Sequence, residues 1–178
     1  LNPTRIGLYS LLKRMGAKIE IANKTVQGGE DVVDLIVSTS PLKGIEADER
    51  DVVLAIDEMP IFAVAAAFAE GATTFRGAKE LRVKESDRIS MTAAVLKSFG
   101  VECEELEDGL TIFGTPTNLR SGKVMDDGAA WRHSLDHRIA MCGAILELCV
   151  TGKYTLDDRE SVETSFPTFE VCLRSLGA

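Results

Sequence analysis

The stretch of residues 81–89, LRVKESDRI, is the part of the chain whose residue types best suit chemistry. Five of its nine side chains are ionisable. Ser86 and Asp87 are good helix N-caps, and the apolar residues that follow recur at the spacing of an amphipathic helix. The pattern predicts a helix from about residue 87 to residue 100, entered through a charged loop.

Lys84 and Glu85 fall in that loop, and Arg88 falls in or near the first helical turn. A cation at this end of a helix opposes the helix dipole, which favours anions there. This unfavourable interaction with the dipole is explained if Arg88 and the free backbone N–H groups share a bound anion. The spacing leaves a second interpretation open, namely a solvated, charged helix start without a ligand.

Two more polar clusters stand where other helices are expected to begin. Asp57 is followed by Glu58, and Asp136 is followed by His137 and Arg138. Helix N-termini gathered at one end of a layered fold form an anion-binding surface, so we expect these clusters and the charged loop to meet on one face. The alternative for the two aspartates is simple N-capping of the helices they precede.

The charged residues suggest a division of labour. Arg88 and Arg138 could each hold a carboxylate or phosphate through paired N–H donors, and Lys84 offers a compact positive charge. Asp57 and Glu85 lie near cations in the sequence and should stay ionised. Either carboxylate could accept or pass a proton.

A metal site is not expected. His133 and His137 are four residues apart and could bind a metal ion together. However, no third ligand is evident, and Arg138 would oppose a cation. We therefore expect neither a metal nor any other cofactor, and Trp131 is expected to serve in packing.

The elements that must position these residues follow a repeating order. Residues 61–70 and 139–150 are apolar on nearly all sides, so these two helices should be buried side by side next to amphipathic second helices. Further expected elements are a first helix from Asn2-Pro3 to Gly16, a last helix from Phe166-Pro167 to Gly177, strands at 17–22, 32–39, 72–77, 101–105, 110–113 and 153–156, and loops at 41–50, 115–130 and 157–165.

The chain also repeats itself. The sequences LKRMGA, LKSFGV and LRSLGA match one another, and residues 57–71 resemble residues 136–152. The repeating unit is helix, strand, helix, strand, strand, which predicts an α/β (α+β) fold whose units bury their faces against one another. The first and last copies are incomplete. We therefore expect residues 1–178 to form a single, partial domain, truncated at both ends relative to its own repeat.

Composition excludes several classes of function. The 178 residues carry a net charge of −8, which argues against a nucleic-acid or membrane-surface binder. No apolar run reaches about 18 residues, so no membrane span is expected. Cys103, Cys142, Cys149 and Cys172 show no C-x-x-C spacing, and the last three lie in apolar helical patterns and should be buried thiols. A reducing cytoplasm is the simplest compartment for them.

Four motifs occur in order along the chain: IDE-x-P at 56–60, LRVKESDRI at 81–89, LDHRIAM at 135–141 and TSFP at 164–167. Together they resemble the family of the 5-enolpyruvylshikimate-3-phosphate (EPSP) synthases. The resemblance runs from NPTR-x-G at residues 2–7 to the C-terminus. Residues 63–71, AVAAAFAEG, are most similar to the bacterial class with reduced sensitivity to glyphosate.

The resemblance implies an enzyme, a 3-phosphoshikimate 1-carboxyvinyltransferase. Such an enzyme transfers the enolpyruvyl group from phosphoenolpyruvate to shikimate 3-phosphate and releases phosphate, in the shikimate pathway to aromatic amino acids. It also implies the enolpyruvyl transferase fold, two domains of three βαβαββ units each with the site in the cleft between them. This chain would then be the C-terminal portion, most of one domain, with its partner domain absent.

The resemblance further implies roles for individual residues. Asp57 and Glu85 would be catalytic, the first as proton acceptor at the shikimate hydroxyls and the second moving a proton at the phosphoenolpyruvate methylene. Substrate-binding roles are implied for Asp57, Lys84, Arg88, Asp136, His137 and Arg138, with the two arginines holding phosphoenolpyruvate. One departure is that Thr164 and Ser165 stand near the place where some family members carry a site lysine.

Two competing functions are considered. One is the sister enolpyruvyl transferase that acts on a UDP-sugar, which is expected to lack this charged stretch. The other is a non-catalytic domain that binds anionic ligands. For the isolated chain we expect no catalysis, because the facing half of the cleft would be missing.

Overall fold

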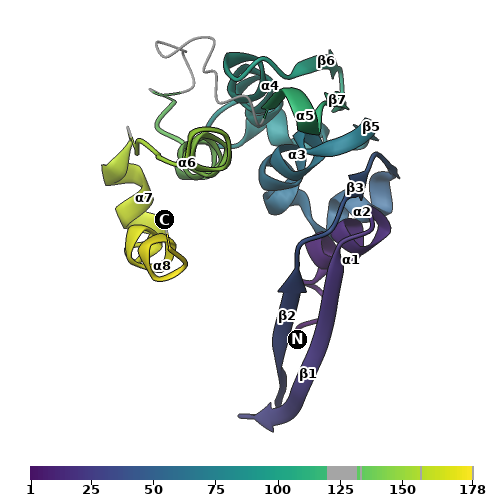
Figure 1. The fold of residues 1–178 in the computed structure, drawn as a ribbon, viewed down its shortest axis with the longest axis vertical. Coiled ribbons are helices and arrows are strands. Elements are labelled where there is room, and N and C mark those ends of the chain that lie inside the picture. Colours follow the sequence, from purple (N-terminus) through teal and green to yellow (C-terminus); the bar gives the residue numbers. More distant parts are fainter. Residues whose placement is uncertain (120–131, 133, 157, 178) are drawn as a thin grey trace.

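The structure consists of a long hairpin, a mixed sheet and a layer of helices, and the strands of the sheet alternate with helices along the chain (Figure 1). The computed structural model describes residues 1–119, 132, 134–156 and 158–177. The strands are β1 (Lys18–Gln27), β2 (Glu30–Ser38), β3 (Leu42–Lys43), β4 (Glu46–Ala47), β5 (Ala69–Phe75), β6 (Glu102–Leu106) and β7 (Gly109–Gly114). The α-helices are α1 (Gly7–Arg14), α2 (Glu49–Leu54), α3 (Met59–Ala67), α4 (Arg88–Ser98), α5 (Pro116–Leu119), α6 (His137–Thr151), α7 (Arg159–Ser165) and α8 (Phe169–Ser175). The 3-10 helices η1 (Ile56–Glu58) and η2 (Lys79–Val83) precede α3 and α4.

The mixed sheet is built around β5. This strand runs antiparallel to β7, from Gly71↔Gly114 to Phe75↔Leu110, and β7 runs antiparallel to β6. The short strands β3 and β4 pair in parallel with its two ends. At Gly109 the backbones approach so closely that a Cβ atom would lie 1.8 Å from the carbonyl oxygen of Phe75. Only glycine fits there, and the tight β6–β7 turn depends on it.

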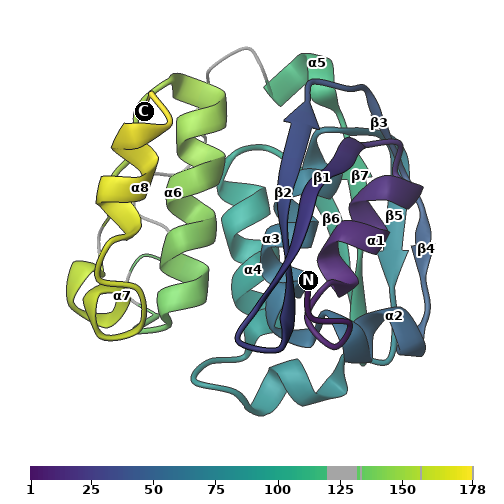
Figure 2. The ribbon, with the colours of Figure 1, turned by 90° about the horizontal axis from the view of Figure 1, so that it is seen from below.

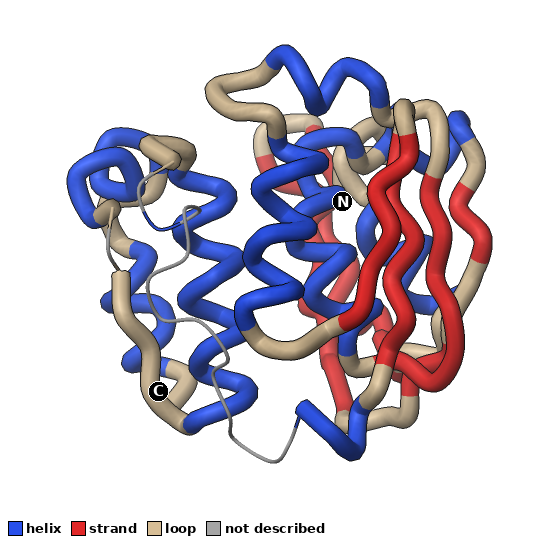
Figure 3. The backbone as a smooth tube through the Cα atoms, turned by 90° about the horizontal axis from the view of Figure 1, so that it is seen from above, coloured by secondary structure: helices blue, strands red, loops and turns tan. Residues whose placement is uncertain are grey.

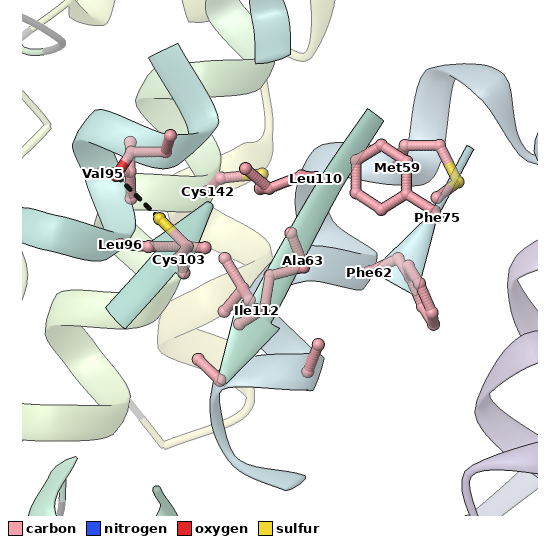
Figure 4. Close-up of a cluster of buried hydrophobic side chains, with 14 of the residues drawn as sticks. Met59, Phe62, Ala63, Phe75, Val95, Leu96, Cys103, Leu110, Ile112 and Cys142 are labelled. Atoms are coloured by element: carbon pink, nitrogen blue, oxygen red, sulfur yellow. Dashed lines mark hydrogen bonds between the residues drawn. The ribbon is translucent and has the colours of Figure 1, made fainter. Parts of the chain in front are cut away.

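Two helices, α3 and α4, lie on this sheet, and α6 completes the helical layer around the core. α3, α4 and α6 pack against one another, with the strands on one side and the α7–α8 pair on the other (Figure 2). The strands gather at one side of the molecule in Figure 3, with the helices at the centre and the other side. Side chains from all three helices and from the sheet meet in the core, among them Phe62, Leu96, Ile112 and Cys142 (Figure 4).

The expected burial of the two most apolar helices is confirmed. Every residue of α3 except Ile61 and Ala65 is buried, because its sequence is apolar on all sides. α6 presents one face to α3 and α4, and another to α7 and α8, where Ala144 packs against Val162 and Phe169. Two partner layers explain why residues 139–150 carry so few polar side chains.

The β1–β2 hairpin extends away from the rest of the molecule (Figure 1). Its register slips between Ala22 and Thr25, where Asn23 adopts a positive φ of 49°. Near its base Ile19 is buried, whereas Ile21, Val37 and other apolar residues of the hairpin are exposed. The hairpin therefore adds little to the core of the described residues.

Several boundaries differ from those expected. The first helix begins at Gly7, because the Asn2 carboxamide oxygen accepts hydrogen bonds from the backbone and hydroxyl of Thr4 in a turn instead of capping a helix. The helix expected at 61–70 ends at Ala67, since residues from Ala69 onward pair with β3 and β7 as a strand. Contacts with the sheet outweigh the helical propensity of this alanine-rich stretch.

Other expectations were wrong in the C-terminal third. Residues 153–156 form no strand, and the loop expected at 157–165 contains α7, which the Asp158 side chain caps. The loop expected at 41–50 contains β3, β4 and the start of α2. Most of the loop expected at 115–130 lies outside the described residues, apart from α5.

Within the described residues, the βαβαββ unit appears once in full, as β4, α3, β5, α4, β6 and β7. The Cys142 thiol is buried, as expected. The expectation was wrong for Cys149 and Cys172, which are exposed, and Cys103 is the other buried cysteine in the described residues. No helix in the described parts of the chain has both the length and the apolar character needed to cross a bilayer.

Candidate active site

Three helix starts meet at one end of the helical layer, and Arg88 lies where they meet. This residue opens α4, Asp57 lies in η1 just before α3, and Asp136 is the N-cap of α6. The packing of α3, α4 and α6 against one another brings these three positions together. The expected convergence of charged residues is therefore found for this group.

The Arg88 guanidinium group is only 2% exposed, and three carboxylates surround it. Its Nε donates to Asp136 Oδ2 at 2.9 Å, and its Nη1 lies 3.4 Å from Asp57 Oδ1. Its Nη2 donates to Glu85 Oε2. The protein itself thus supplies the anions that compensate a cation at a helix N-terminus, where the sequence suggested a bound ligand.

Asp136 is fully buried and has two tasks at once. Its Oδ1 accepts the backbone N–H of Arg138 at 3.0 Å as the helix cap, while its Oδ2 accepts from Arg88 and from the Ser86 hydroxyl at 2.9 Å. Burial is the largest single influence on the pKa of Asp136 and acts to raise it. The hydrogen bonds from Arg88, Ser86 and the Arg138 backbone, with the Arg88 charge, outweigh burial and hold that pKa below its ordinary value.

Asp57 links the two arginines. Arg138 Nη1 donates to the Asp57 carbonyl oxygen at 3.0 Å, and its Nη2 lies 3.4 Å from Asp57 Oδ2. The side chain of Arg138 is 32% exposed, so it remains within reach of a ligand. The N-capping alternative is wrong for Asp57, because it precedes the N-cap of α3 and its carboxylate pairs with arginines; Asp136 combines capping with ion pairing.

The remaining expected site residues lie around this buried cluster or outside the described residues. The ammonium group of Lys84 pairs with Glu80 of η2, four residues earlier. Glu85 is 53% exposed, so it is the carboxylate around Arg88 that solvent reaches most easily. His137 is the first residue of α6, beside Asp136. His133 lies outside the described residues, as does Trp131.

A cavity of about 230 Å³ opens beside these charges. Asp57, Glu58 and Arg138 form its polar rim. Its apolar walls come from α3, α6, Phe166 and the start of α8, namely Ile61, Met141, Cys142, Ile145, Phe166 and Phe169. The sequence did not indicate this cavity. The one related signal was that residues 61–70 are apolar on nearly all sides, so more than one face of this helix had to pack against a neighbour.

The arrangement suits an anionic substrate better than a metal ion. In the described parts of the chain, no group of three His, Cys, Asp or Glu side chains could hold a metal. Two guanidinium groups face three carboxylates, so an incoming anion has to exchange with a carboxylate already in place. Carboxylates released in this way can carry protons.

The chain is similar in sequence to known proteins of one family. The family model described as EPSP synthase (3-phosphoshikimate 1-carboxyvinyltransferase) matches residues 1–173. The chain is similar to 3-phosphoshikimate 1-carboxyvinyltransferases from Caldicellulosiruptor saccharolyticus, 49% identical over 169 residues, and Rhizobium johnstonii, 49% identical over 178 residues. These alignments cover 95% and 100% of the chain, but only 37% and 39% of the two relatives.

The chain is also similar to solved structures, and it again covers only part of their length. The chain is similar to an EPSP synthase structure from Acinetobacter baumannii with a TM-score of 0.81 and 43% sequence identity. The match covers 98% of this chain and 39% of that one. The chain therefore spans less than two-fifths of the proteins it matches.

Proposed function

The chain belongs to the EPSP synthase family, and from that premise we propose that the protein containing it transfers the enolpyruvyl group of phosphoenolpyruvate to shikimate 3-phosphate. The observation that carries the proposal is the convergence of two arginines with three carboxylates at neighbouring helix starts. Clustered guanidinium groups suit a carboxylated, phosphorylated enol, and the carboxylates suit the proton transfers that its reaction requires.

In this proposal Arg138 and Arg88 bind the carboxylate of phosphoenolpyruvate. Arg138 is partly exposed and meets the ligand first. Arg88 becomes available once Glu85, the most exposed of its partners, moves aside. Exchange of one carboxylate for another keeps the buried guanidinium group compensated, which avoids the large cost of leaving it unpaired.

Glu85, freed from Arg88, takes up a proton from solvent and then delivers it to the methylene carbon of phosphoenolpyruvate. A hydroxyl oxygen of shikimate 3-phosphate bonds to the neighbouring carbon, and Asp57 accepts the proton of that hydroxyl group. Phosphate then leaves the tetrahedral intermediate while Glu85, again a carboxylate, takes back a methyl proton, and the double bond is restored. Asp136 holds Arg88 from behind the site, His137 completes its wall, and Lys84 turns from Glu80 towards the transferring group and shikimate 3-phosphate.

The remaining parts of the proposal concern the context of the chain. We propose that residues 1–178 make up most of one of two domains, and that the rest of the site comes from the other. The coverage of less than two-fifths of the relatives supports this division. A cytoplasmic location is also proposed, because the four cysteines are free thiols, as a reducing compartment keeps them.

The test is steady-state kinetics of the full-length protein, with phosphate release from the two substrates as the signal. Arg138→Lys should raise KM for phosphoenolpyruvate by about 2- to 12-fold with little change in kcat, since it keeps the charge but loses one hydrogen bond of a paired contact made before the reaction. Glu85→Gln should lower kcat by about 10²–10⁴-fold. Arg159→Lys, in an exposed pair with Glu170, is the matched control and should leave both constants unchanged.

Three outcomes would contradict the proposal. If the unmutated protein releases no phosphate, the activity is wrong. If Glu85→Gln keeps normal turnover and raises KM instead, Glu85 is only a counter-ion of Arg88. If residues 1–178 alone release phosphate at the rate of the full-length protein, no second domain contributes to the site.

A further inference from the structure

The segment that carries Lys84 and Glu85 has little to hold it in place. Between Val83, which ends η2, and Arg88, which begins α4, the backbone follows no regular helix or strand. Val83 is 81% exposed and makes no apolar anchor. The position of the two site residues therefore depends on polar contacts at the two ends of the segment.

The contacts at the C-terminal end belong to the ionic cluster already described, where Ser86 and Arg88 bind Asp136. The contacts at the N-terminal end come from Arg82, a residue to which sequence analysis assigned no role. Its side chain is directed at the turn between β6 and β7 and at the N-cap of α4.

Arg82 uses all three of its guanidinium nitrogens. Its Nε donates to the carbonyl oxygen of Glu107 at 2.8 Å, and its Nη2 donates to the carbonyl oxygen of Leu106 at 2.6 Å. Its Nη1 donates to Asp87 Oδ2 at 2.8 Å. Asp87 in turn caps α4 through the backbone N–H of Ser90 at 3.1 Å. A planar group bound at three points has only one orientation, so the turn, Arg82 and the start of α4 form one rigid unit.

We infer that Arg82 is a positioning residue that holds Lys84 and Glu85 in place for the reaction, acting through Asp87 and the β6–β7 turn. The inference rests on the proposed function. Both ends of the segment are bound to elements of the rigid core, and the intervening residues are few enough to be placed by those ends. Without Arg82, the polar contacts that remain among the described residues of the segment are the clamp at Asp136 and the ion pairs of Lys84 with Glu80 and of Glu85 with Arg88.

The first test measures the segment directly in this chain, without reference to activity. Arg82→Ala should increase deuterium uptake in peptides spanning residues 83–91, because the cap of α4 loses its support. Lys79→Ala is the matched control. Lys79 lies on the same 3-10 helix, and its ammonium group binds the Glu107 carboxylate of the same turn at 2.8 Å, but both side chains of this pair are exposed. It should leave uptake unchanged. Equal uptake in unmutated protein and Arg82→Ala overturns the positioning role.

The second test is a double-mutant cycle in the full-length protein. Arg82→Ala should lower kcat by about 10²-fold, the effect of misplacing a catalytic group by about 1 Å, with KM changed by less than about threefold. Arg82→Lys keeps the charge but not the three-point contact, so its kcat should lie between those of the unmutated protein and Arg82→Ala. In a Glu85→Gln background, Arg82→Ala should lower kcat by clearly less than in the unmutated protein, because one of the two positioned groups has already lost its function.

The two proposals fail in different ways. Fully additive effects of Arg82→Ala and Glu85→Gln on kcat overturn the link between Arg82 and Glu85. Absence of transfer by unmutated protein overturns the proposed function, while the deuterium measurement still decides whether Arg82 holds the segment. If Arg82→Ala does not fold, Arg82→Lys carries both measurements, and normal uptake with normal kcat in that variant counts against the three-point contact.

Discussion

Replacing Asp136 by Asn should show how strongly the ionic cluster stabilises the fold. The amide keeps the shape of the side chain, and its oxygen can still accept the backbone N–H of Arg138 as a helix cap. Its NH₂ group, however, faces the Nε donor of Arg88 where a carboxylate oxygen stood 2.9 Å away. A buried guanidinium group thereby loses one charge partner and meets a donor instead.

The magnitude follows from burial. Removing one partner of a buried pair costs about 3–5 kcal/mol. Arg88 keeps Glu85 and Asp57 as partners, so the lower end applies, about 3 kcal/mol. For a domain of this size that corresponds to a fall in Tm of about 6–12 °C. Urea unfolding of the 178-residue chain, followed by circular dichroism, measures the free energy of unfolding directly.

The pH dependence provides a second, independent check. Because the pKa of Asp136 is lower in the folded protein than in the unfolded chain, its contribution is complete above the unfolded value of about 4 and is lost as the pH falls through the folded value. The difference in stability between the unmutated chain and Asp136→Asn should therefore be largest near neutral pH and shrink below about pH 4.

A matched control is available at another helix start. Asp158 caps α7 by accepting the backbone N–H of Ser161, and Asn caps helices about as well as Asp. Asp158→Asn should change the free energy of unfolding by less than about 0.5 kcal/mol. If Asp136→Asn is as mild as this control, Glu85 and Asp57 suffice to compensate Arg88, and the argument from the buried pair is refuted.

Three further predictions concern strain, close packing and thiol reactivity. Leu135 is 75% exposed with a positive φ of 55°, so Leu135→Asn should raise the free energy of unfolding by about 1 kcal/mol in urea titrations, and a decrease would contradict this. Gly109→Ala should lower it by more than about 2 kcal/mol, since the added Cβ would lie 1.8 Å from the Phe75 carbonyl oxygen; a thermal melt with unchanged Tm would disprove the close approach. In brief alkylation with iodoacetamide, exposed Cys172 should react, whereas Cys142, whose pKa burial raises to about 12, should react only after unfolding; peptide mass spectrometry distinguishes the two.

Local signals predicted the starts of α4 and α6 well, but not the start of α1 or the end of α3. Asp87 and Asp136 both cap the helices expected after them, because an N-cap acts on the next few residues only. The end of α3 was misplaced, since residues 69–75 read locally as a continuation of an alanine-rich helix and then a short strand. Their actual conformation depends on pairing with β7, more than 30 residues away, which no local pattern contains.

The candidate site could likewise be predicted from the sequence only in part. The repeat placed Asp57, Arg88 and Asp136 at equivalent helix starts, and packing of three helices was enough to bring them together. Which charges would pair, and how deeply Arg88 would be buried, could not be predicted from spacing. The same holds for Arg82, whose partners are backbone carbonyl groups of a turn more than 20 residues away and carry no signal in the sequence.

The β1–β2 hairpin has a consequence for how copies of this chain behave in concentrated solution. In the described residues its two strands pair only with each other, so both outer edges present free backbone N–H and C=O groups, and residues such as Ile21 and Val37 are open to water. Open edges with apolar side chains are templates for pairing with another chain. The net charge of −8 repels copies at a distance, but it acts weakly across a contact at physiological salt. The hairpin is thus a place where copies of this chain can pair edge to edge, and shielding it should help to keep the chain dispersed.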